Sequence, residues 1–61
     1  MKFAYSVEIH LPVLDKWVES DNGWLGEVSE TLAVDVLKGT RLNYPASSFR
    51  LVCWWGKVLT D

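Results

Sequence analysis

The sequence lacks the usual means of holding a very short chain together. Its 61 residues include one cysteine and one histidine, so Cys53 has no partner for an internal disulfide, and cysteine and histidine cannot supply four zinc ligands. Small domains normally need such a support, because they bury only about 60% of the surface that their unfolded chain exposes. An aromatic-rich core, self-association, or both must take its place.

Long hydrophobic runs are also missing. No apolar stretch approaches the ~20 residues that span a bilayer, and Lys2 is followed by alternating residues rather than by the apolar run of a secretory leader. A lone cysteine fits a reducing compartment. We therefore expect a single cytoplasmic domain over residues 1–61 that does not bind a membrane.

The first half of the chain is predicted to form β-strands. In residues 2–11 the apolar side chains fall on one face and Pro12 ends the pattern. Residues 17–19 and 24–28 are predicted as short strands joined by a hairpin turn at Ser20-Asp21-Asn22-Gly23, with Gly26 marking a bulge. Two pairings stay open: residues 2–11 with 14–19, or with one long kinked strand through 16–28.

A helix and a further strand follow. Ser29 is a good N-cap, and apolar residues recur at helical spacing at Leu32, Ala33, Val36 and Leu37. Gly39 could end this helix, but we favour an end at Asn43, before Pro45. Residues 48–55 alternate again, and Val58-Leu59 could form a small extra strand. The order β-β-α-β predicts an α+β domain with one helix on a small antiparallel or mixed sheet.

Catalysis has little support in this sequence. His10, with Glu8 two positions away, could be read as an oriented general base, but a solvated histidine is the favoured interpretation because no positioned nucleophile accompanies it. Cys53 lies mid-strand on the apolar face and is predicted to be buried and inert. No glycine-rich phosphate loop is present. We expect no enzyme activity, no cofactor and no metal.

Charge is unevenly distributed along the chain. Six basic residues stand against eight acidic ones, for a net charge of −2, which argues against direct nucleic-acid binding. Acidic residues dominate positions 15–35 and basic residues positions 38–57. Three interpretations stay open: ordinary solvated faces, self-association of basic with acidic segments, or an acidic surface that approaches a basic groove on another protein.

Four tryptophans are more than so small a core can hide. In a regular strand Trp54 and Trp55 point to opposite faces, and which of the two is exposed stays open. A single helix covers one side of a sheet, so Val52, Arg50 and Trp54 are predicted on an uncovered face, where exposed aromatics mark interaction sites. The alternative is that residues 12–28 fold back and cover this face.

The segment from Glu30-Thr31-Leu32 through the helix to Tyr44-Pro45-Ala46 and Phe49-Arg50-Leu51-Val52 resembles part of the small phage-made inhibitors of host RNA polymerase. Its order and acidity are also similar to phage inhibitors of uracil-DNA glycosylase, which act as dimers in the DNA-binding groove of the enzyme. The resemblance covers about residues 30–52, and the segment Cys53–Lys57 has no counterpart in it. It implies an architecture and a blocking mode of action.

Together these observations predict a non-enzymatic protein-binding module, encoded by a phage or mobile element, that blocks a bacterial host protein in the cytoplasm. A self-associating structural or assembly protein, a homo-oligomer that uses the same aromatic face, is the alternative. The predicted contact residues combine an aromatic anchor with an acidic approach surface: Trp54, Val52, Arg50, Trp24, Trp17, Asp15, Glu19, Asp21, Glu27 and Glu30.

Overall fold

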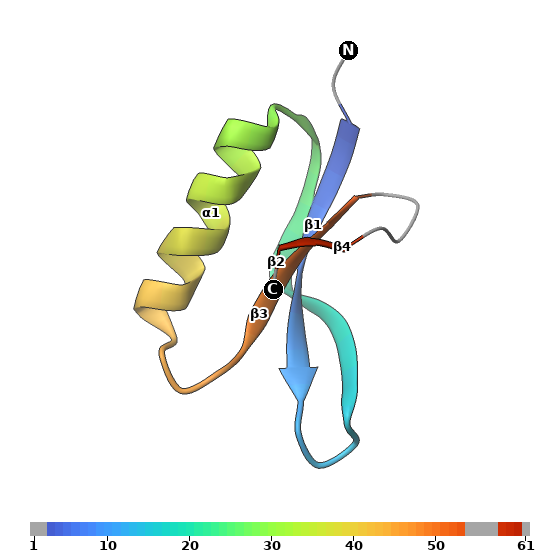
Figure 1. Cartoon of the computed structure of the whole chain (residues 1–61), viewed down its shortest axis with the longest axis vertical. Coiled ribbons are helices and arrows are strands. Elements are labelled where there is room, and N and C mark those ends of the chain that lie inside the picture. Colours follow the sequence, from blue (N-terminus) through green and yellow to red (C-terminus); the bar gives the residue numbers. More distant parts are fainter. Residues whose placement is uncertain (1–2, 54–57, 61) are drawn as a thin grey trace.

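A four-stranded antiparallel sheet with one helix on one side confirms the α+β class (Figure 1). The computed structural model describes residues 3–53 and 58–60. Along the chain the elements are β1 (Phe3–Leu11), β2 (Lys16–Val28), α1 (Glu30–Asn43), β3 (Phe49–Cys53) and β4 (Val58–Thr60). The sheet order is β2-β1-β3-β4, so β2 and β4 are the edge strands. The small extra strand at Val58-Leu59 is present as β4.

The first two strands form one long hairpin whose turn is at residues 12–15. Of the two predicted pairings, the long kinked second strand is the one observed. The predicted hairpin turn at Ser20–Gly23 is wrong, since this segment lies inside β2. The turn begins with Pro12 and ends at Asp15, whose φ of 48° is in the left-handed region that aspartate tolerates.

Residues Ser20–Gly23 instead make a large bulge, here called the β2 bulge. Between the pairs Ser6↔Trp24 and Glu8↔Glu19, β1 advances two residues and β2 five, so three residues are extra. The Ser20 hydroxyl donates to the carbonyl of Val7 at 3.0 Å and ties the bulge to β1. Asn22 has φ 57°, which explains why Asn-Gly chemistry is found here without a hairpin turn.

A second irregularity confirms the bulge predicted at Gly26. Tyr5 pairs with Gly26 and Ser6 with Trp24, so the residue between them is extra. Gly26 has φ 73°, a value that a side chain would strain.

The helix confirms the favoured boundaries. The Ser29 hydroxyl accepts from the amide of Leu32 at 3.2 Å, which satisfies one of the free N–H groups at the helix start. The chain remains helical through Gly39 and ends at Asn43. The amide of Tyr44 donates to the carbonyl of Thr40, and Pro45 follows.

The core lies between α1 and the sheet. Ala33 and Leu37, one turn apart, are at most 1% exposed. The predicted inward position of Leu32 is wrong, because this residue is 50% exposed; at 100° per residue it lies well outside the Ala33–Leu37 stripe. The sheet contributes the other buried members of this cluster: Tyr5, Val7, Phe49, Leu51 and Cys53.

Two of these core residues carry ionisable groups. Cys53 is buried and free, as predicted. Tyr5 is 3% exposed, and its pKa is raised from the ordinary 10.0, first by burial and then by the nearby Cys53 and Glu30, which disfavour a phenolate. Neither group is accessible for chemistry in the folded state.

Candidate protein-binding face of the sheet

The side of the sheet opposite α1 is here called the open face. Because directly paired residues of antiparallel strands project to the same side, the register assigns its members. Among residues 3–53 and 58–60, no further element packs over this side (Figure 1). Its members are Ala4, Ser6, Glu8, His10, Trp17, Glu19, Trp24, Glu27, Arg50, Val52 and Val58.

Trp24 is the exposed aromatic residue of the open face. It pairs with Ser6 at the edge strand β2, and 56% of it is exposed. Val58 of β4, at the far end of the same row, is 39% exposed. A tryptophan this exposed is a large area of apolar surface left in water. It was one of the predicted contact residues.

Trp17 is half-buried because Arg50 lies over it. The guanidinium carbon of Arg50 is 4.5 Å from the centroid of the Trp17 ring, a cation–π arrangement. The same guanidinium donates through Nε and Nη2 to one carboxylate oxygen of Glu8, each at 2.8 Å. Arg50 is thus on the predicted face, but its charge is already paired within the chain.

His10 completes this cluster, and the carboxylate beside it is Asp15 rather than Glu8. Its Nε2 lies 3.1 Å from a carboxylate oxygen of Asp15, and its ring centroid is 5.1 Å from that of Trp17. The interpretation of Glu8 as the group that orients His10 is wrong, because Glu8 is held by Arg50 across the β1–β3 pair. Cys53, the only thiol, lies buried on the opposite side of the sheet.

The five predicted acidic contact residues are all exposed, but they do not share one face. Glu19 and Glu27 lie on the open face on either side of Trp24 along β2, and Asp15 lies beside His10. Asp21 lines a cavity on the helix side, and Glu30 begins α1. The acidic residues that adjoin Trp24 are therefore Glu19 and Glu27, while Asp15 lies at the hairpin end of the open face.

Val52 is not available as the predicted contact residue. It lies on the open face, yet it is only 5% exposed. It pairs with Ser6 of β1 and Val58 of β4, and Ser6 is likewise only 8% exposed, so the centre of the open face is buried while Trp24 at its edge is not. The predicted anchor Trp54 lies outside the described residues, as does Trp55.

One exposed apolar feature was not predicted. Val13 and Leu14, at the tip of the β1–β2 hairpin, are 94% and 64% exposed. Apolar residues in a tight turn are unusual, because turns favour glycine, proline and small polar residues. The sequence Pro12-Val13-Leu14 therefore held a signal that could have identified this tip as a further exposed surface.

Other kinds of site find little support in the described residues. Among residues 3–53 and 58–60, no group of three or more histidine, cysteine or acidic side chains could hold a metal ion. In the same part of the chain, no helix has the length and hydropathy needed to cross a membrane. No family model, curated protein or solved structure matches this chain.

Proposed function

We propose that this protein is a non-enzymatic protein-binding module that blocks a bacterial host protein, with the open face of its sheet as the contact surface. One observation carries the proposal: Trp24 is 56% exposed on a sheet face that α1 does not cover. Tryptophan is the residue type most enriched among binding hot spots, where it contributes by filling a pocket on the partner. Trp24 takes the anchoring role here.

Preorganisation of the surrounding surface supports the same proposal. The guanidinium of Arg50 packs on the ring of Trp17 and forms an ion pair with Glu8. Both charged side chains are about three-quarters buried, at 24% and 22% exposure. A rigid patch loses less side-chain entropy on binding than a mobile one, so this cluster favours recognition next to Trp24.

Charge indicates the chemistry of the partner. Glu19 and Glu27 flank Trp24, and neither has an ion-pair partner among the described residues. Arg41 of α1 does not offset this negative charge, because it lies on the helix side of the sheet, where its Nη2 donates to the carbonyl of Phe49 at 2.9 Å. The exposed charge beside Trp24 is therefore negative. A complementary partner would have a basic groove with a pocket that binds the indole ring, and the opposite charges would raise the rate of association.

The host-blocking and phage-encoded parts of the proposal rest on the resemblance of residues 30–52 to phage inhibitors, together with this acidity. An acidic module that occupies a basic groove prevents other ligands from entering that groove. Direct binding of nucleic acid by this chain itself is disfavoured by its charge of −2. Cytoplasmic action follows from the same proposal.

The experiment is affinity capture from a bacterial lysate with three tagged proteins: the wild-type chain, Trp24→Thr and Leu42→Ala. Threonine keeps the strand propensity of position 24 while it removes the indole. Leu42 is a matched control, an apolar residue that is 81% exposed on α1. We expect one protein to be captured by the wild type and Leu42→Ala and lost with Trp24→Thr, at equal melting temperatures. Equal capture by all three would contradict the proposal.

A further inference from the structure

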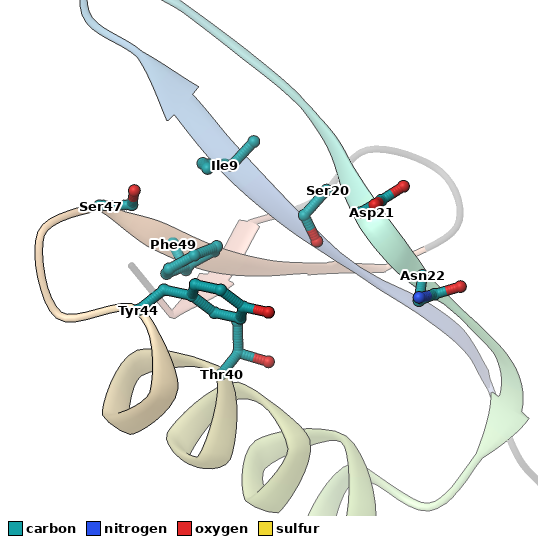
Figure 2. A pocket seen from close by; sticks show the side chains of 8 residues that line it. All are labelled: Ile9, Ser20, Asp21, Asn22, Thr40, Tyr44, Ser47 and Phe49. Carbon is teal, nitrogen blue, oxygen red and sulfur yellow. The ribbon is translucent and has the colours of Figure 1, made fainter.

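A cavity of about 250 Å³ lies on the helix side of the sheet, away from the open face. Figure 2 shows its walls. Thr40 belongs to the last turn of α1, and Tyr44 is the residue after this helix. Phe49 comes from β3, Ile9 from β1 and Ser20 from the β2 bulge. The cavity thus exists because β2 bulges at this level. Its size suits one side chain or a small molecule.

Four residues with hydroxyl groups line this cavity, Ser20, Thr40, Tyr44 and Ser47, and two of these hydroxyl groups already donate their proton within the chain. Ser20 already donates its proton to the carbonyl of Val7 at 3.0 Å, and Thr40 donates to the carbonyl of Val36 at 2.9 Å. A hydroxyl has one proton to donate and two lone pairs. Both oxygens can therefore only accept from a ligand.

The charge of the lining favours a cation. Asp21 and Asn22 stand at the rim on the β2 side (Figure 2), and no lysine, arginine or histidine among residues 3–53 and 58–60 lines the cavity. Phosphate and carboxylate ligands would meet the Asp21 carboxylate at the rim, while the nearby guanidinium of Arg41 already donates to the carbonyl of Phe49, so these anions are disfavoured. A ligand that carries positive charge and donates hydrogen bonds fits the Asp21 carboxylate at the rim and the oxygens of Ser20 and Thr40.

The aromatic rings of the cavity favour a guanidinium group over an ammonium group as the bound cation. The rings of Tyr44 and Phe49 have centroids 6.3 Å apart with an interplanar angle of 54°, and Tyr44 is 63% exposed. Aromatic faces attract cations, and a planar guanidinium both stacks on them and donates up to five hydrogen bonds while accepting none. An ammonium lacks the planar face.

We propose that this cavity binds the guanidinium group of an arginine side chain presented by a peptide. The guanidinium stacks against Tyr44 and donates to the oxygens of Ser20 and Thr40, with the Asp21 carboxylate at the rim. The site lies on the opposite side of the sheet from Trp24 and is independent of the proposed function, because a short peptide tests it without any partner protein.

The test is a titration of ¹⁵N-labelled protein, followed by two-dimensional NMR, with the peptide acetyl-Gly-Arg-Gly-amide. The matched probe carries citrulline, which keeps the shape of arginine without its charge. We expect saturable shifts at residues 20–22, 40–44 and 47–49, with a dissociation constant of about 1–10 mM. The citrulline peptide should bind at least about threefold more weakly.

Two variants localise the effect. Asp21→Asn should weaken the arginine peptide about twofold to threefold. Glu19→Gln is the matched control, since it removes the same charge from the same strand on the opposite side of the sheet, and it should change binding less. The proposal is overturned by an absence of saturable shifts up to about 50 mM, by equal binding of the citrulline peptide, or by equal effects of the two variants.

Discussion

Gly23 provides a sensitive test of the β2 bulge, because a single methyl group should disrupt it. A Cβ atom at this position would lie 2.4 Å from the carbonyl oxygen of Val7, 2.6 Å from the Ser20 hydroxyl and 2.8 Å from the Ser20 carbonyl. Two of these three atoms belong to the backbone, which cannot rotate away. The change Gly23→Ala therefore forces β1 and β2 apart.

The expected destabilisation follows from three contributions. Overpacking costs about 1–3 kcal/mol, and loss of the hydrogen bond from Ser20 to Val7 costs about 1 kcal/mol. The lower entropy of the unfolded alanine chain offsets about 0.4–1 kcal/mol. The net free energy of unfolding should fall by about 1–3.6 kcal/mol, which lowers Tm by about 4–29 °C in a domain of this size.

The assay is urea and thermal unfolding followed by tryptophan fluorescence, with Gly39→Ala as the matched control. Gly39 lies within α1, and a Cβ there meets no atom within 4 Å. The same substitution should therefore raise stability by about 0.5–1 kcal/mol, because alanine is the better helix former. An unchanged Tm for Gly23→Ala, or a loss in Gly39→Ala of similar size, would refute this account of the bulge.

Three further predictions concern capping, ionisation and assembly. Ser29→Ala removes the cap on the Leu32 amide and should cost about 1 kcal/mol in thermal unfolding; an unchanged Tm would contradict the cap. The raised pKa of Tyr5 means that the unfolded state loses this proton first, so stability should fall as the pH rises above 10. Tyr5→Phe should reduce this loss, and an identical pH profile would argue against burial as its cause. Because Glu19 and Glu27 would repel each other if two β2 edges paired, light scattering coupled to gel filtration should show a monomer at micromolar concentration, whereas a stable dimer would favour the assembly-protein alternative.

Local chemistry was sufficient to predict most of the fold. The alternation of Tyr5 and Val7 and the period of Ala33 and Leu37 reflect burial, which a sequence records directly. The Ser29 cap depends on a residue only three positions away. Such short-range signals are visible in one sequence because no other segment needs to be known.

Apart from the inward position of Leu32, which is a matter of helix geometry, the errors came from contacts between distant residues. Asn22-Gly23 has the chemistry of a hairpin turn, but the bond from Ser20 to Val7, thirteen residues apart, holds the segment in a bulge. Arg50 was expected to be free for a partner, yet it pairs with Glu8, 42 residues away. The cavity beside Tyr44 depends on that same bulge, so no local pattern in the sequence predicts it.

The central claim is that Trp24 anchors a partner. The ratio of the dissociation constants of Trp24→Thr and the wild-type chain for that partner tests it most directly. With the captured protein purified, calorimetry measures its dissociation constant for the wild-type chain and for Trp24→Thr, with Leu42→Ala as the reference for a neutral apolar truncation. A hot-spot tryptophan contributes about 2 kcal/mol or more, so the account predicts weakening of at least about 30-fold for Trp24→Thr. Equal dissociation constants for Trp24→Thr and wild type, with both proteins folded, would contradict it.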